Sequence, residues 1–112
     1  MEKKYKVKDS SKYTYIEFFG DIDDTVCPKY KQEISMLIEQ NKKKDMIFDF
    51  KEVTFIDSSG IGMILGRYNQ LKGHRKKLYV CKTNPHIQKL FKISGIYTII
   101  NEFNEEKVGE LL

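Results

Sequence analysis

Tryptophan is absent from the 112 residues of this chain, and proline, cysteine and histidine occur only twice each. Cys27 and Cys81 lie far apart in no metal-type spacing, so we expect two free thiols, buried or half-buried, rather than a disulfide. His74 and His86 also lack the spacing of metal ligands, and we expect both to be ordinary surface residues. This scarcity predicts no bound metal and no cofactor.

Long apolar runs are missing as well. No run approaches the length of a membrane span, and the opening Met-Glu-Lys-Lys-Tyr lacks the apolar region of a signal peptide. We therefore expect a cytoplasmic protein that does not bind membranes. The chain is long enough for one hydrophobic core, which predicts a single domain over residues 1–112. Without a coiled-coil pattern or a long exposed apolar strand, a monomer is expected.

The excess of positive charge does not indicate a nucleic-acid-binding protein. Lysine and arginine total 20 against 16 aspartate and glutamate, a formal net charge of +4. The basic residues are scattered among the acidic ones, and no segment of helical spacing combines several basic and base-stacking residues on one face. We interpret them as a solvated surface.

Motifs of common catalytic sites are also missing. The sequence has no Gly-x-Ser-x-Gly elbow, no phosphate-binding loop and no Cys-x-x-Cys pair. Gly60-Ile61-Gly62 is too short for a dinucleotide fingerprint. A small hydrolase that pairs Ser58 with a histidine remains an alternative without a supporting motif. We expect a protein that is not an enzyme.

Apolar patterns divide the chain into strands and helices. Alternation predicts an antiparallel hairpin, and the apolar run at residues 46–50 predicts a strand covered on both faces. The expected strands are residues 5–7, 13–19, 46–50, 78–81 and 97–100. Helices are expected from near Pro28, from the turn after Asp57 to about Lys72 where Gly73 closes it, from Pro85 to Gly95, and after Asn104 with Val108, Leu111 and Leu112 as its apolar positions.

Strands that alternate with helices favour crossover connections. The sequence therefore predicts an α/β domain with a mixed, mostly parallel sheet, one antiparallel edge hairpin and about four helices packed on it.

The most informative segment runs from Thr54 to Tyr68. An apolar approach ends at Asp57, Ser58 and Ser59, three residue types that cap helix N-termini. Apolar residues then recur at helical spacing, which predicts that one helix face packs inward; these are Ile61, Ile64, Leu65, Tyr68 and Leu71. Serine hydroxyls at the positive end of a helix dipole are suited to carry a phosphate.

The motif Asp57-Ser58-Ser59-Gly60-Ile61-Gly62, continued by Ile64-Leu65-Gly66-Arg67-Tyr68, resembles the signature of bacterial anti-sigma factor antagonists of the STAS class. Length and element order fit as well, so the resemblance covers essentially the whole chain. Within the family, the chain is most similar to the sporulation branch, which antagonises the anti-sigma-F factor. The resemblance also implies the STAS fold, a mixed sheet with helices packed on it.

The resemblance implies a role for Ser58, which would otherwise be interpreted as a plain helix cap. In this family the serine directly after the aspartate is phosphorylated by the anti-sigma factor, itself a serine kinase, and a serine phosphatase removes the phosphate. Ser59 occupies the position of a second Ser or Thr, as a cap and a fallback phosphorylation site. Asp57 is either a turn residue or a group that aligns the serine hydroxyl or contacts the kinase.

Asp23 matches the acidic loop that family members place near the phosphoserine. The sequence then departs from its close relatives, because Asp24-Thr25-Val26-Cys27 replaces their histidine-containing continuation. This departure leaves the partner contacts of the loop open.

Three glycines in a helix are costly, at about 1 kcal/mol each relative to alanine. They are Gly60, Gly62 and Gly66. Close packing is one explanation; for Gly62 and Gly66 we favour a shallow groove that receives a partner. Met63 and Arg67 lie beside that face and are expected to add an apolar and a charged partner contact.

The resemblance thus implies partner switching. The unphosphorylated form binds the anti-sigma factor and frees a sigma factor, and phosphorylation at Ser58 abolishes binding. One alternative is a related antagonist in a stress-response sigma pathway. A second is a nucleotide-sensing module with weak nucleotide binding between the Asp23 loop and the Ser58 turn.

Overall fold

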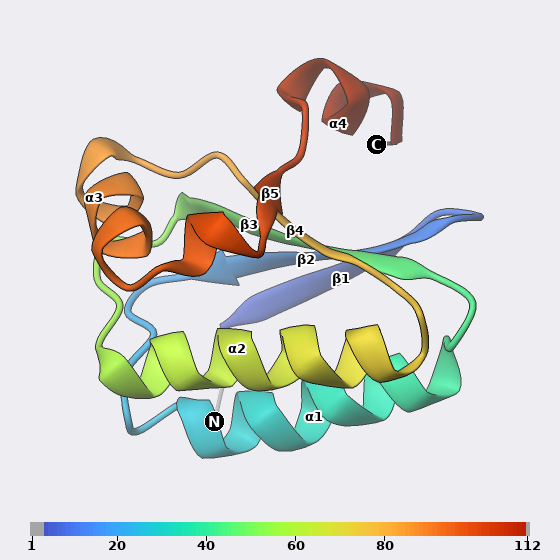
Figure 1. Ribbon diagram of the computed structural model, residues 1–112, viewed down its shortest axis with the longest axis horizontal. Helices are drawn as coiled ribbons and strands as arrows, with labels where there is room; N and C mark the ends of the chain where they lie inside the picture. The colour runs from blue at the N-terminus through green and yellow to red at the C-terminus, as the bar shows by residue number, and fades with distance from the viewer. Residues whose placement is uncertain (1–3, 112) are drawn as a thin grey trace.

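The computed structural model describes residues 4–111, apart from the side chain of Leu111 (Figure 1). Its elements in chain order are β1 (Tyr5–Asp9), β2 (Tyr13–Phe19), α1 (Cys27–Gln40), β3 (Asp45–Glu52), α2 (Ser58–Gly73), β4 (Leu78–Cys81), α3 (Pro85–Ile93), the 3-10 helix η1 (Ile96–Thr98), β5 (Asn101–Glu102) and α4 (Glu105–Leu111).

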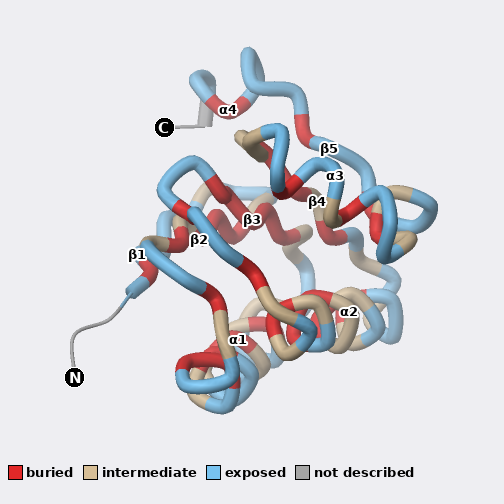
Figure 2. The backbone as a smooth tube through the Cα atoms, turned by 90° about the vertical axis from the view of Figure 1, so that its left-hand side faces the viewer, coloured by how far each residue is buried: buried red, intermediate tan, exposed pale blue. Residues whose placement is uncertain are grey.

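The strands form one sheet in the order β1-β2-β3-β4-β5. The hairpin β1–β2 is antiparallel, and every other neighbouring pair is parallel. Helices α1 and α2 lie side by side on one face of the sheet, and α4 lies on the other (Figures 1 and 2). The predicted fold class is confirmed: a mixed, mostly parallel sheet with one antiparallel edge hairpin and four α-helices.

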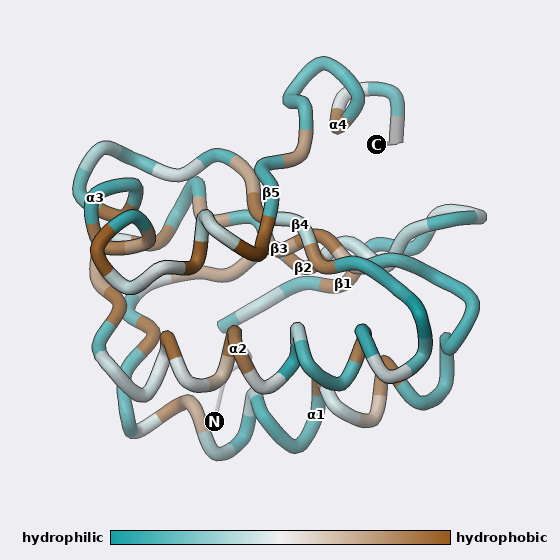
Figure 3. Tube along the Cα trace, in the orientation of Figure 1, coloured by the Kyte–Doolittle hydropathy of each residue, from teal (hydrophilic) through white to brown (hydrophobic). Residues whose placement is uncertain are grey.

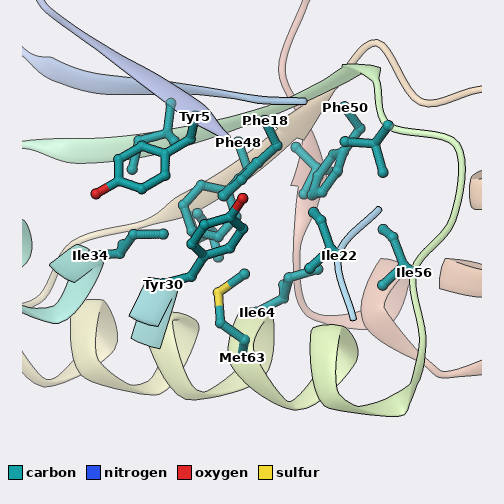
Figure 4. Packing of buried hydrophobic residues seen from close by; sticks show 14 of the residues in the cluster. Tyr5, Phe18, Ile22, Tyr30, Ile34, Phe48, Phe50, Ile56, Met63 and Ile64 are labelled. Atoms are coloured by element: carbon teal, nitrogen blue, oxygen red, sulfur yellow. The ribbon is translucent and has the colours of Figure 1, made fainter. Parts of the chain in front are cut away.

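The central strand β3 is buried on both faces, as its apolar run predicts. Met46, Phe48 and Phe50 point into the main core beneath α1 and α2, whereas Ile47 belongs to a second cluster under α4. Aromatic rings fill much of the main core, where Phe18 packs edge-on against Phe48 with ring centroids 5.0 Å apart (Figure 4). The sheet therefore separates two apolar clusters.

Helix α1 begins where its proline allows. Pro28 occupies the first turn, where a missing backbone N–H costs nothing. Tyr30, Ile34 and Ile38 recur at four-residue steps and are all buried. In Figure 3 the hydrophobic segments of α2 likewise lie on the side that faces the sheet.

The buried face of α2 is wider than the sequence predicts. Ile64 and Leu71 are fully buried as expected, but Ile61, Leu65 and Tyr68 are only partly buried against the core. The structure instead buries two residues that were expected to reach a partner: Met63 is 3% and Arg67 7% exposed. The reason is that α2 packs against α1 as well as the sheet, so a second side of the helix is covered.

The prediction of a strand at residues 97–100 is wrong. Gly95 adopts a left-handed φ of +82° after α3, and the chain continues as η1. Ile96 and Ile100 are both buried, and the amide of Ile100 donates to the carbonyl of Ile96 at 2.8 Å. A four-residue step between inward positions belongs to helical turns, so the last strand, β5, forms only at Asn101–Glu102.

The end of α2 and the start of α4 are each predicted from a single residue. Gly73 lies inside α2, and the left-handed residue that follows is Arg75, with φ +59°. Asn104 accepts a hydrogen bond from the amide of Glu106 at 2.8 Å, so the predicted cap of α4 is confirmed. Val108 is buried as expected, whereas Leu112 and the side chain of Leu111 lie outside the described residues.

Both cysteines are free and buried, as predicted. His74 lies near the surface against Glu39, with Nε2 and Oε2 2.7 Å apart, and His86 is exposed. Within residues 4–111, no three His, Cys, Asp or Glu side chains gather where they could hold a metal ion. Each helix in that range falls short of the length and apolar character needed to cross a membrane.

We predict that Ile64→Asp unfolds the protein, because Ile64 is fully buried in the main core (Figure 4). A buried, unpaired charge costs on the order of 5 kcal/mol, comparable to the whole stability of a small domain. Thermal unfolding followed by circular dichroism is the measurement. Asn69→Asp, an exposed change on the same helix, is the control and should melt like the wild type. A cooperative wild-type melt of the Ile64 variant would contradict the packing described.

Candidate functional site

The turn that begins α2 is built around Asp57. This residue is the N-cap, with extended backbone angles, and its Oδ1 accepts a hydrogen bond from the amide of Gly60 at 3.0 Å. Of the three residues that the sequence offers as caps, Asp57 takes the role. One of the four unpaired N–H groups of the helix start is thereby satisfied.

Asp57 also joins this turn to the loop between β2 and α1. Its second oxygen, Oδ2, accepts from the amide of Asp24 at 3.1 Å. The backbones pair as well: the amide of Ile22 donates to the carbonyl of Phe55 at 2.9 Å, and the amide of Asp57 donates to the carbonyl of Ile22 at 3.2 Å. Two segments more than 30 residues apart in sequence are thus held side by side.

Ser58 is the first residue of α2, and it is exposed. Its hydroxyl makes no hydrogen bond to any residue in the described range 4–111, because Asp57 already supplies the cap. The interpretation of Ser58 as a helix cap is therefore wrong. The structure leaves an unengaged hydroxyl at the positive end of a 16-residue helix.

Asp23 accepts hydrogen bonds from residues of its own loop. Its Oδ1 accepts from both the amide and the hydroxyl of Thr25, at 3.0 and 2.6 Å, and the Thr25 hydroxyl bond lowers the pKa of the Asp23 carboxyl. Its carbonyl accepts from the amide of Cys27 at 3.0 Å. These bonds fix the entry to α1 beside the Ser58 turn.

The neighbourhood of Ser58 is acidic. Burial raises the pKa of the Cys27 thiol to about 11, and the negative charges of Asp57, Asp23 and Asp24 add to the shift in that order. The thiol therefore stays protonated and unreactive at neutral pH. A further negative charge on Ser58 would enter a region that already carries three carboxylates.

The three glycines of α2 have different surroundings. A Cβ on Gly60 would lie 2.5 Å from Cγ2 of Ile56 and 2.9 Å from the carbonyl oxygen of Ile22, so close packing explains this glycine. Apart from its chain neighbours and the backbone of its own helix, a Cβ on Gly62 or Gly66 would meet no described atom within 4 Å. The packing within the described chain therefore requires only the first of them.

A shallow groove of about 420 Å³ runs between the first turns of α1 and α2. Ser59, Gly62 and part of Met63 form its α2 side, and Asp24, Cys27, Pro28 and Lys31 form the other. The α1 wall was missed at the level of sequence, because nothing in the periodicity of α1 indicates which helix lies beside it. Of the two glycines predicted to form a groove, Gly62 lines this one and Gly66 does not.

Two predicted contact residues do not lie on an open surface. The side chain of Met63 is part of the main core beneath α2, where it lies close to Tyr30 (Figure 4). Arg67 is buried between α2 and α1, where its Nη1 donates to the carbonyl of Lys31 at 3.2 Å. The expectation that both side chains are displayed to a partner is therefore corrected.

The sequence profile of the STAS domain matches residues 4–108 of this chain. The chain belongs to the STAS domain family. The fold agrees: the phosphorylated form of the Bacillus cell fate determinant SpoIIAA superposes on this STAS domain with a TM-score of 0.74 at 25% sequence identity, covering 95% of this chain and 96% of that one.

Relatives of this STAS domain include antagonists of two anti-sigma factors. The anti-sigma F factor antagonist of Paenibacillus polymyxa is 26% identical over 91 residues, which cover 81% of this chain and 78% of its own length. The anti-sigma-B factor antagonist of Staphylococcus aureus is 26% identical over 96 residues, which cover 84% and 88%.

Asp57→Ala should destabilise this STAS domain by about 1–3 kcal/mol, because one change removes a helix cap and leaves the amide of Asp24 without its acceptor. Urea unfolding gives the free energy, and amide hydrogen exchange should quicken at Asp24 and Gly60. Asp24→Ala is the matched control: it keeps the backbone N–H that Asp57 binds, so its stability should be close to wild type. If the amides of Asp24 and Gly60 exchanged as slowly in the Asp57 variant as in the wild type, the geometry described would be contradicted.

Proposed function

We propose that this STAS domain is an anti-sigma factor antagonist whose binding is switched by phosphorylation of Ser58. The observation that carries the proposal is the exposed, unengaged hydroxyl of Ser58 at the first position of α2, beside a groove. In this cycle the unphosphorylated form binds the anti-sigma factor and frees a sigma factor. The anti-sigma factor, acting as a serine kinase, then modifies Ser58, and a serine phosphatase restores the hydroxyl. The domain is a phosphoacceptor and binding module, not an enzyme.

The physical basis of the switch is a difference between two energies. Phosphoserine adds about −1.5 to −2 charges at neutral pH. At a helix N-terminus this charge gains about 0.3–1 kcal/mol, so the fold survives it even beside Asp57. Against a partner surface that covers Ser58, like-charge repulsion and desolvation cost on the order of several kcal/mol. The interface term is larger, so phosphorylation dissociates the complex without unfolding the domain.

The partner surface of the proposal comprises Asp23, Asp57, Ser58, Ser59 and the open glycines of α2. Gly62 and Gly66 support it, because the fold does not require either glycine although each costs helix stability. An absent side chain on an exposed helix lets a partner backbone approach closely. Gly60 contributes indirectly, because its packing against Ile22 holds the Asp23 loop next to the turn.

The pathway is either the sporulation sigma-F system or a stress-response sigma-B system. The relatives in Paenibacillus polymyxa and Staphylococcus aureus favour one each, at equal identity. We propose the sporulation pathway, which the motif resembles most, and co-purification of the bound anti-sigma factor separates the two.

Nucleotide sensing fits this groove less well. The groove has a single basic lining residue, Lys31, and Asp24 lies in the same lining. A polyphosphate would meet the acidic loop without a glycine-rich phosphate cradle. A partner protein is therefore the better occupant.

We predict that Ser58→Ala binds the anti-sigma factor with wild-type affinity and is never released by ATP and magnesium. Ser58→Asp should bind more weakly, since one carboxylate supplies part of the charge of a phosphate. Full phosphorylation of the wild type should weaken binding at least about 100-fold, a loss on the order of 3 kcal/mol. Calorimetry measures the affinities, and intact mass with peptide mapping locates the phosphate.

Ser59→Ala is the control for these variants, because it removes the neighbouring hydroxyl and keeps Ser58. It should still accept one phosphate, at Ser58. A phosphate found on Ser59, or wild-type affinity of the phosphorylated protein, would refute the proposed switch. Loss of binding in a folded Ser58→Ala variant would count equally against it.

Gly62→Ala and Gly66→Ala should separate stability from binding. Each is expected to raise the free energy of unfolding by about 1 kcal/mol, since alanine favours helix and nothing in the described structure obstructs its Cβ. Each should weaken anti-sigma factor binding by about tenfold, because a methyl group overpacks a close interface.

Gly60→Ala provides the contrast in urea unfolding. Its Cβ would collide with Ile56 and Ile22, so it should lower the free energy of unfolding by about 1–3 kcal/mol. If Gly62→Ala and Gly66→Ala both bound the anti-sigma factor as tightly as wild type, the open side of α2 would lie outside the interface.

A further inference from the structure

Arg67 carries a buried charge that no described residue neutralises. The residue is 7% exposed, and none of the ion pairs within residues 4–111 involves it. Its one hydrogen bond goes from Nη1 to the carbonyl of Lys31, and its Nε is buried without a partner. Burial alone lowers the pKa of the guanidinium. Buried arginines are ordinarily paired with carboxylates, so this one lacks its usual partner.

A phosphate on Ser58 cannot fill that role. The two residues are separated by about 13 Å along the axis of α2, at 1.5 Å per residue, which is beyond contact and beyond the screening length of physiological salt. Gln70 on the same helix also has a buried, unpartnered side-chain atom, its Oε1. Its amide is neutral, however, and does not balance the charge of Arg67. The charge of Arg67 is therefore open to a carboxylate from outside the described chain.

Arg67 contacts a residue that lines the groove between α1 and α2. Lys31, whose carbonyl Arg67 binds, lines the groove, and Gly62 lies in its opposite wall. Gly66 precedes Arg67 and leaves open space where a side chain would stand. A partner chain that follows α2 from Gly62 to Gly66 reaches the residue before Arg67, whose guanidinium lies on the Lys31 carbonyl.

We propose that the bound anti-sigma factor places an aspartate or glutamate side chain against Arg67, a specificity contact that rests on the function proposed above. Charge supports this choice of occupant. Three carboxylates around Ser58 disfavour an acidic side chain at that end of the groove, whereas Arg67 and Lys31 attract one at the other.

The test compares Arg67→Met with Lys31→Met in kinetic measurements of anti-sigma factor binding. Methionine keeps an unbranched apolar chain, so free Arg67→Met should melt at or above the wild-type temperature, as expected when a buried unpaired charge is removed. Its dissociation rate should rise at least about 30-fold, the lower range for losing one side of a desolvated charge pair. Lys31→Met removes an exposed charge of the same sign and should change mainly the association rate, in a salt-dependent way.

Arg67→Lys and a set of partner variants make the test specific. Lysine keeps the charge but not the planar fork, so this variant should fold normally and bind with an intermediate dissociation rate. Among Asp→Asn and Glu→Gln variants of the anti-sigma factor, one should show no further loss when combined with Arg67→Met.

The outcomes separate this inference from the proposed function. If wild-type protein fails to bind any anti-sigma factor, the proposed function fails. If wild type binds and Arg67→Met binds equally, or if its loss is coupled to no acidic residue of the partner, only the carboxylate contact is overturned. Should Arg67→Met unfold, wild-type kinetics of Arg67→Lys would overturn it. Stabilisation by millimolar inorganic phosphate in wild type but not in Arg67→Met would assign the site to a free anion instead.

Discussion

The site depends on the two oxygens of one carboxylate. Oδ1 of Asp57 caps α2 through Gly60, and Oδ2 holds the loop before α1 through the amide of Asp24. A single side chain thereby fixes a helix start and joins it to a segment more than 30 residues away in sequence. Because Asp57 takes the capping role, the hydroxyl of the adjacent Ser58 is left without a hydrogen bond among the described residues. An asparagine would offer one acceptor oxygen where two are used.

Glycine placement in α2 shows how one helix meets two different demands. Gly60 lets α2 approach the chain at Ile22 and Ile56 more closely than any larger residue allows, and the position of the loop follows from it. Gly62 and Gly66 serve no such contact and still cost helix stability. Under the function proposed above, this cost in stability keeps the outer surface of α2 open to a partner.

The sequence predicts the sheet and its order of elements well, because each strand and helix has a clear local pattern. Asn84 and Asn104 cap their helices as their residue types indicate. The segment after α3 differs, because its apolar residues read equally as strand or tight helix until Gly95 sets the direction of the chain.

The errors in the site come from tertiary packing. Met63 and Arg67 lie beside the apolar stripe of α2, and only the position of α1 decides that this side is covered. The α1 wall of the groove, with Cys27 and Lys31, has the same origin. Which of Asp57, Ser58 and Ser59 caps the helix depends on backbone angles that all three types can adopt.

The sheet also divides the molecule into two sides with separate clusters of apolar residues. The groove and Ser58 belong to the side of α1 and α2, whereas α4 covers the opposite face through Val108 (Figure 1). A label, tether or second domain joined after α4 would begin on the far side of the sheet. Such an addition would lie across the sheet from Ser58 and from the groove, so a partner bound there under the proposed function would not meet it.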